Sequence, residues 1–351
     1  MQKPGITINN RLISAISPPY IIAELSANHN GRIENAYKII EAAKQSGADA
    51  VKLQTYRPDT ITIDMRTAEF MIEGGLWGGQ SLYELYESAF MPWEWHTPLF
   101  EHARKLGITL FSSPFDTTAV DLLEDLNAPA YKIASFEAVD LPLIKYVAST
   151  GKPMIISTGM ADAEEIQEAI DAAKAGGCKE LAILHCVSGY PAPPEDYNLR
   201  TIPDMMARFG LVTGLSDHTI DNSTAIASVA LGASIIEIHV TLDRSGGGPD
   251  DSFSLEPKEL EALCKDAKTA WSALGKVDYG RKSSEQGNVK FRRSLYVVKD
   301  IKAGETITQD NVKSIRPGYG LAPKYYAQVL GKKASQNIQK GIPLNFELLE
   351  N

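Results

Sequence analysis

Two histidines occupy equivalent places in neighbouring segments of the chain. His218 ends the run Gly-Leu-Ser-Asp-His, and His239 ends Ile-Ile-Glu-Ile-His, each after apolar and β-branched residues. A helical pattern over 223–231 separates them, which predicts a strand–helix–strand unit with an imidazole at each strand end. Such ends meet at one mouth of a parallel α/β barrel, where two neutral imidazoles can hold a divalent metal. The structural alternative is a buried pair satisfied by the core.

Polar and charged residues also end the other predicted strands. Lysine supplies a point charge and serine supplies hydrogen-bond donors, a set suited to an anion with carboxylate and phosphate groups. For either lysine alone, an ion pair with Glu24 is the structural alternative. Glu24 is a candidate acid or base, because neighbouring lysines and burial can tune a carboxyl in either direction. The candidate substrate-binding residues are Lys52, Gln54, Ser113, Lys132, Ser135, Ser157, Ser188, Tyr190, Ser216 and Glu237.

Eight strand patterns, each followed by a helical pattern, must position these residues. Eight such units in about 255 residues predict an α/β fold, the TIM (β/α)8 barrel. The expected strands are 20–24, 50–54, 109–112, 130–133, 153–157, 181–185, 211–216 and 235–239. The expected helices are 33–45, 93–106, 117–126, 141–149, 163–175, 201–209, 223–231 and 257–274.

Two segments depart from a minimal barrel. The insertion 56–92 follows the second strand and is rich in glycine and aromatic residues, which predicts a lid or substrate wall. After a barrel domain at 1–278, the pattern predicts a linker at 279–290 and a small, mostly β domain at 291–351. From residue 290 onward the chain has 11 Lys and Arg against 5 Asp and Glu, although its net charge is −9. This basic tail predicts docking onto an acidic body or an anionic substrate.

Composition excludes several classes of function. The acidic balance argues against nucleic-acid binding, and no apolar run approaches the ~20 residues of a membrane span. We find no signal-peptide pattern, and three widely spaced cysteines predict reduced thiols in the cytoplasm. Of the other histidines, His185 is expected to be structural and His29 to stabilise a loop. His96 and His102 are expected to face solvent on a surface helix.

Eight runs of residues, in this order, carry a family resemblance. They lie at 21–31 (IIAELSANHNG), 48–56 (ADAVKLQTY), 112–115 (SSPF), 131–135 (YKIAS), 157–160 (STGM), 190–193 (YPAP), 214–219 (GLSDHT) and 292–295 (RRSL). Over essentially its whole length the chain resembles the sialic acid synthase family, enzymes that condense phosphoenolpyruvate with an amino-sugar aldehyde. Three further runs and part of the first resemble one branch of that family: 92–96 (PWEWH), 253–257 (FSLEP), 315–321 (IRPGYGL) and the LSANHNG segment of 21–31.

The resemblance implies roles for the residues named above. It makes His218 and His239 ligands of a divalent metal, typically manganese, with magnesium or cobalt as alternatives. It implies that Glu24 is the acid or base, that Asp250 lies near sugar and metal, and that the lysines and serines bind phosphoenolpyruvate. The tail resembles an antifreeze-like (SAF) domain, which in such enzymes swaps across a homodimer. Arg316 then lies over the partner's barrel mouth.

Two departures from the family pattern bear on substrate and site. Ser188 stands where many sialic acid synthases carry Asn, which supports a sugar other than N-acetylmannosamine. The usual Glu-Lys-His-Phe run is Glu-Ile-His-Val at 237–240, with the exchanged residues expected on the strand face away from His239.

Three alternative functions stay open on the sequence. The first is another nonulosonate synthase, acting on an N-acetylmannosamine-type or legionaminate precursor. The second is a Schiff-base aldolase that uses Lys52 or Lys132, which borohydride would trap. The third is a non-enzymatic carbohydrate- or ice-binding protein, which would leave the polar barrel mouth unexplained.

Overall fold

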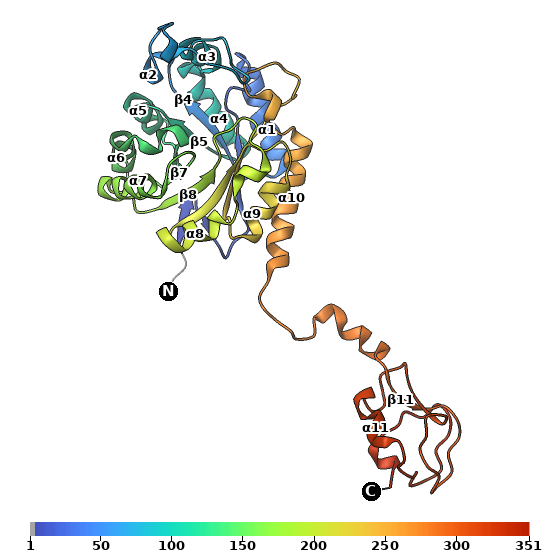
Figure 1. The fold of residues 1–351 in the computed structure, drawn as a ribbon. Helices are drawn as coiled ribbons and strands as arrows, with labels where there is room; N and C mark the ends of the chain where they lie inside the picture. The colour runs from blue at the N-terminus through green and yellow to red at the C-terminus, as the bar shows by residue number, and fades with distance from the viewer. Residues whose placement is uncertain (1–3, 351) are drawn as a thin grey trace. The chain divides into compact units, whose positions relative to one another are not determined.

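The computed structural model describes residues 4–350 and divides the chain into two compact units, Met1–Gly275 and Lys276–Asn351 (Figure 1). Each unit has its own buried core. No helix within residues 4–350 combines the length and apolarity needed to cross a membrane. All three cysteines are free and buried.

Eight parallel strands in the first unit close into a barrel in chain order, with the last strand pairing with the first. The predicted TIM barrel is therefore confirmed, and each predicted strand ends within two residues of the observed one. The strands could be predicted from the sequence because they are buried on both faces, which produces continuous apolar runs. The strands are β3 (Tyr20–Glu24), β4 (Ala50–Thr55), β5 (Thr109–Pro114), β6 (Tyr131–Ile133), β7 (Met154–Ser157), β8 (Leu181–Cys186), β9 (Val212–Asp217) and β10 (Ile235–His239).

A long helix follows each strand and covers the outside of the barrel (Figure 1). Their ends carry expected signals: Asp116 accepts hydrogen bonds from two backbone amides of α5, and Gly47 and Gly107 end α1 and α4 in the left-handed conformation. The helices are α1 (Ile33–Ser46), α4 (His96–Leu106), α5 (Thr117–Asp125), α6 (Leu141–Ser149), α7 (Ala163–Gly176), α8 (Thr201–Phe209), α9 (Ser223–Ala230) and α10 (Pro257–Leu274).

The barrel interior is apolar at its amino end. Alternate residues of β3 face opposite sides, so Ile21 packs under the helices while Tyr20 and Ile22 pack inside. A hairpin of β1 (Gly5–Ile8) and β2 (Arg11–Ser14), which the sequence reading missed, adds three isoleucines to the interior cluster. With this end sealed, the polar strand ends form the opposite mouth.

The insertion after β4 is partly helical. It contains α2 (Pro58–Ile61), a 3-10 turn (Ala68–Phe70) and α3 (Leu82–Ala89). A capping box starts α3: Ser81 accepts a hydrogen bond from the Glu84 amide, and the Glu84 carboxylate accepts one from the Ser81 amide. No residue of α3 is buried, although the helix is largely apolar.

The second unit has a core built around a two-stranded antiparallel sheet. β11 (Ser294–Val297) and β12 (Val312–Ile315) form this sheet, and a single antiparallel bridge joins Thr306 to Lys333. The predicted linker 279–290 contains most of a 3-10 helix. The helical segments are Ser283–Phe291, Pro323–Tyr325, α11 (Tyr326–Val329) and Phe346–Leu348.

The expectation that His96 faces solvent is wrong. His96 is fully buried in the first turn of α4, where its Nε2 lies 2.8 Å from Thr55 Oγ1. Thr55 Oγ1 in turn lies 2.6 Å from Ser112 Oγ, so the imidazole is tied to β4 and β5. His102 on the same helix is partly buried, with Nε2 3.1 Å from Glu41 Oε1.

Acidification should destabilise the fold through its buried imidazoles. Burial lowers the pKa of His29 and of His96 to about 4, below the usual 6.5. As the pH falls below 6.5, these histidines become protonated in the unfolded chain but stay neutral in the folded chain. The free energy of unfolding therefore falls. We expect the melting temperature, measured with chelator, to drop between pH 6.5 and 4.5. The drop should be smaller for His96→Gln; an unchanged slope would contradict this account.

Candidate active site

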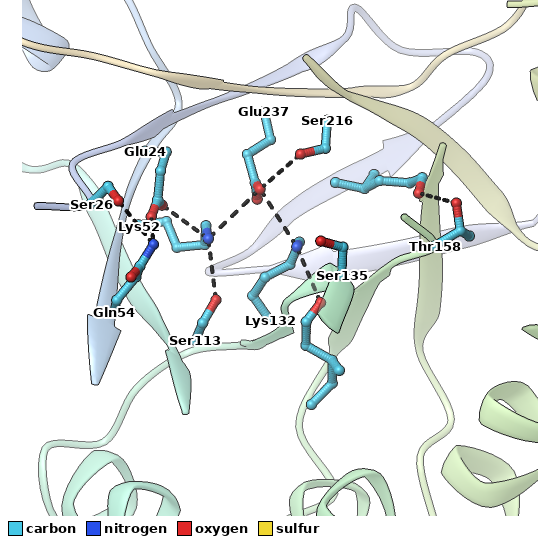
Figure 2. A network of polar contacts seen from close by, with 12 residues as sticks. Glu24, Ser26, Lys52, Gln54, Ser113, Lys132, Ser135, Thr158, Ser216 and Glu237 are labelled. Atoms are coloured by element: carbon cyan, nitrogen blue, oxygen red, sulfur yellow. Dashed lines mark hydrogen bonds and ion pairs between the residues drawn. The ribbon is translucent and has the colours of Figure 1, made fainter. Parts of the chain in front are cut away.

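A network of buried charges lies at the carboxyl end of the barrel (Figure 2). Lys52 Nζ is 3.0 Å from Glu24 Oε2 and 3.7 Å from Glu237 Oε1. Lys132 Nζ lies 3.5 Å from the same Glu237 oxygen. None of these four residues is more than 5% exposed. Charges so far from water are tolerated because each has a partner of opposite sign.

The network determines which groups are charged near neutral pH. Burial raises the pKa of Glu24 to about 7, against the opposing effect of Lys52. Burial alone would raise the pKa of Glu237, but Lys132 and Lys52 outweigh it and hold that pKa below its usual range. Burial lowers the pKa of Lys132, whereas burial of Lys52 is outweighed by Glu237 and Glu24, which raise its pKa. With Glu24 protonated, two cations face one carboxylate, which favours an anionic ligand.

Serine hydroxyls surround these charges. Ser113 Oγ accepts a hydrogen bond from Lys52 (3.2 Å), and Ser216 Oγ donates one to Glu237 (3.2 Å). Ser188 Oγ donates to Ser135 Oγ at 2.9 Å. Ser157 Oγ is buried and has no hydrogen-bond partner among residues 4–350. Buried hydroxyls normally have partners, so Ser157 is available to a ligand.

One cavity of about 470 Å³ gathers most of the predicted site residues. Ser113 and Ser188 do not line it, but each is hydrogen-bonded to a residue that does. Arg316 follows β12 in the second unit and is exposed there. The predicted residues that line the cavity are Glu24, Lys52, Gln54, Lys132, Ser135, Ser157, Tyr190, Ser216, His218, Glu237, His239 and Asp250.

His218 and His239 converge in this cavity. Their ring centroids are 5.3 Å apart, and Tyr190 lies against His218 with centroids 4.4 Å apart. His218 Nδ1 is 2.7 Å from the Val187 carbonyl oxygen, which leaves its other ring nitrogen free. His239 Nδ1 is buried without a partner in the described part of the chain.

These imidazoles fit a divalent metal. Burial lowers the pKa of His218 to about 4 and holds that of His239 well below its usual 6.5, so both rings are neutral at pH 7, as metal ligands must be. The Val187 carbonyl fixes one tautomer of His218, a common support for a metal-bound imidazole. No group of three or more histidine, cysteine or acidic side chains within residues 4–350 could hold a metal. A metal here would keep positions open for other ligands.

Comparison with known proteins identifies the family of this chain. The NeuB family pattern matches residues 39–279, most of the chain. The chain belongs to the NeuB family. The SAF domain pattern matches residues 292–350.

Two similar NeuB-family relatives share a name. Pseudaminic acid synthase of Helicobacter pylori is 45% identical over 337 residues, 95% of this chain and 99% of that protein. Pseudaminic acid synthase of Campylobacter jejuni strain 81-176 is 47% identical over 324 residues, 92% of this chain and 94% of that protein. The runs at 92–96, 253–257 and 315–321 and the LSANHNG segment predicted a branch of the family, and that branch is the pseudaminic acid synthases. The comparison confirms this prediction.

A solved structure extends the comparison to the fold. The N-acetylneuraminic acid synthetase of Leptospira borgpetersenii, in complex with citrate, aligns with a TM-score of 0.73 at 31% identity. The alignment covers 83% of this chain and 96% of that one.

Asp250 lies beside the imidazole pair in this NeuB-family barrel. Its Oδ2 is 4.0 Å from His239 Nδ1 and accepts a 2.5 Å hydrogen bond from Ser26 Oγ. Burial raises the pKa of Asp250. Ser26 also accepts a hydrogen bond from Gln54, which donates to Glu24 as well (Figure 2). Through Ser26, a continuous polar chain links Asp250 to the charged network.

Glu137 lines the same cavity and was missed by the sequence reading. The 3-10 turn Ser135–Val139 that follows β6 brings its carboxyl to the mouth. Glu137 Oε2 is buried and without a partner among the described residues, and burial raises the Glu137 pKa to about 7. An acidic residue two positions after a predicted site serine was the available signal.

The departure at 237–240 leaves the site intact. Ile238 and Val240 pack into the core between strands and helices, on the face away from His239 and Glu237. The substitutions therefore exchange outer-core residues and not cavity residues.

Proposed function

We propose that this protein is a pseudaminic acid synthase. It condenses phosphoenolpyruvate with 2,4-diacetamido-2,4,6-trideoxy-β-L-altropyranose, in its open-chain form, to give pseudaminic acid and phosphate. The observation that carries the proposal is the pairing, in one cavity, of a buried Lys52–Lys132 anion site with two neutral imidazoles. The names of the similar relatives support the choice of sugar.

The charged network would hold phosphoenolpyruvate. Lys52 and Lys132 provide positive charge, and Ser157 and its neighbouring hydroxyls provide donors. Binding in this cavity fixes the enol carbon relative to the aldehyde, which replaces a bimolecular encounter by an oriented reaction. Glu237 balances the lysines when no ligand is bound.

His218 and His239 would hold a divalent metal, for which we propose manganese, with magnesium and cobalt as substitutes. When bound, such a metal supplies Lewis-acid polarisation of the sugar's aldehyde oxygen. Asp250, beside His239, would position the sugar hydroxyls. The other steps of the reaction, which are C–C bond formation, water addition and phosphate release, involve phosphoenolpyruvate, water and the protein's own side chains.

C3 of phosphoenolpyruvate attacks the aldehyde carbon: the C2–C3 π electrons form the new C–C bond, the aldehyde C–O π bond opens, and the aldehyde oxygen takes up a proton. Water adds at C2 and gives up one proton. The second proton of that water passes to the departing phosphate as the C2–O bond breaks, which leaves a ketone at C2. Glu24, whose pKa is about 7, can accept one proton and return it within the same cycle.

Phosphate release from phosphoenolpyruvate with this sugar tests the proposal. Another nonulosonate synthase would prefer N-acetylmannosamine or a legionaminate precursor in the same panel. A preference for one of those sugars would replace the proposed substrate within the family. Absence of phosphate release with every sugar would overturn the proposal.

We propose further that the protein acts in the cytoplasm as a homodimer in which Arg316 reaches the partner's barrel mouth. The family resemblance and the basic tail support this. Mixing Arg316→Ala chains with Lys132→Met chains tests it. We expect each variant alone to be nearly inactive, and refolded mixtures to regain part of the activity, since one barrel in each heterodimer has both residues. If Arg316 acts within its own chain, mixtures will stay inactive.

A further inference from the structure

The insertion after β4 presents an apolar face to the cavity. Leu82, Leu85, Tyr86 and Ala89 on α3 line it at positions i, i+3, i+4 and i+7, which form one helical stripe. Such a stripe normally packs against a core, but no residue of α3 is buried. Part of this apolar face is therefore available to contact a ligand in the cavity.

Two residues outside α3 complete this apolar wall, defined as Ile72, Trp77, Leu82 and Leu85. No charged residue of 58–92 lines the cavity. Glu84, within α3, is instead used in the cap with Ser81 and in an ion pair with Arg66. The insertion thus directs its charges away from the cavity.

Trp77 fixes the wall next to the reacting groups. Its indole Nε1 donates a 3.1 Å hydrogen bond to the Pro249 carbonyl, one residue before Asp250. Its ring lies 5.8 Å, between centroids, from Tyr190, which packs on His218. The wall and the imidazole pair therefore border the same end of the cavity, whereas Lys52 and Lys132 lie within β4 and β6.

We propose that the apolar wall binds methyl groups of the sugar and selects for them. This rests on the proposed function. Phosphoenolpyruvate has no methyl group, and its negative charges favour binding at Lys52 and Lys132. The apolar wall is therefore available to the second substrate, the sugar. The proposed sugar carries three methyl groups, at C6 and on two acetamides. An apolar wall favours these over hydroxyl or hydrogen at the same positions.

Matched sugars and matched variants test this inference. The sugars are the proposed substrate, its 6-hydroxylated counterpart and its bis-formamido counterpart, which lacks the acetyl methyls. The variants are Leu85→Ser in the wall, Leu85→Met as the apolar replacement, and Leu76→Ser as the control. Leu76 lies beside Trp77 in the chain but is 52% exposed and does not line the cavity. Melting temperatures establish that each variant folds.

We expect the unaltered protein to prefer the full substrate over at least one counterpart by about 10-fold to 100-fold in kcat/KM. Leu85→Ser should remove most of that preference, while Leu85→Met and Leu76→Ser retain it. The KM for phosphoenolpyruvate should be similar in all four proteins. If Leu85→Ser loses kcat/KM equally for every sugar, or if the unaltered protein shows no preference, the inference about the wall is overturned. The proposed function would not be affected by either result. No turnover of any of these sugars would overturn the proposed function as well.

Discussion

Replacing His218 or His239 by alanine is expected to abolish metal binding and to lower kcat/KM about 10³-fold or more, since Lewis-acid polarisation is worth several kcal/mol. His218 is held through Nδ1 by the Val187 carbonyl, so its free nitrogen is oriented before any metal arrives. His239 lies 5.3 Å away, centroid to centroid, with its own Nδ1 unpaired. Losing either ring leaves one imidazole, which cannot retain the ion alone.

Equilibrium titration of the metal-stripped protein with manganese measures this without relying on turnover. The unaltered protein should bind one equivalent per chain, and both variants should lose that binding. His102→Gln is the matched control, because it removes a partly buried histidine from α4, outside the cavity. Full activity of the unaltered protein after thorough chelation would refute the role of the two histidines.

Much of the barrel could be predicted because its strands produce unusually clear patterns. Strands buried on both faces read as continuous apolar runs, and a polar residue at the end of such a run marks the catalytic mouth. Glu24 and His239 are visible in this way, and Lys52 is visible as a charge within the run at 50–54. The hairpin β1–β2 was missed because its four-residue strands carry too few residues to display a period.

His96 shows that the sequence held a signal that was not used. His96, Leu99, Phe100 and Ala103 follow the i, i+3, i+4, i+7 spacing, and all four are buried. The helical phase therefore indicates an inward-facing His96, although histidine as a residue type is often exposed.

Pairings between distant residues could not be predicted in the same way. The Lys132–Glu237 contact joins strands on different sides of the barrel, and local patterns do not specify which charges meet. Glu137 was missed for a related reason, since a loop after a strand can turn its side chain toward or away from the mouth. The apolar stripe of α3 is visible in the sequence, but the cavity it faces is not.

Replacing Lys132 by methionine is expected to damage folding and catalysis, and a second substitution should separate the two effects. Lys132 is 1% exposed, and its ammonium lies 3.5 Å from Glu237 Oε1 and 3.1 Å from the Ile133 carbonyl oxygen. Removing one member of an isolated buried pair typically costs about 3–5 kcal/mol. Glu237 keeps Lys52 at 3.7 Å as a second partner, so the cost here should lie at the lower end of that range or below it, and Lys132→Met should lower the melting temperature by a measurable amount.

The double variant Lys132→Met/Glu237→Gln removes both charges and should recover much of that stability. Its kcat/KM for phosphoenolpyruvate should stay about 10²-fold or more below normal, because a cation that contacts the anion is still missing. Recovery of activity together with stability would mean that Lys132 serves only the fold.

The same lysine also decides between condensation and Schiff-base chemistry. Burial lowers the pKa of Lys132, a property that a Schiff-base lysine also needs. Its position argues for charge instead, because the ammonium is held between a carboxylate and a carbonyl oxygen that both favour the protonated form. Borohydride added during turnover should leave the mass of the protein unchanged. A trapped adduct on Lys132 or Lys52, formed equally well after chelation, would replace the proposed mechanism by an aldolase.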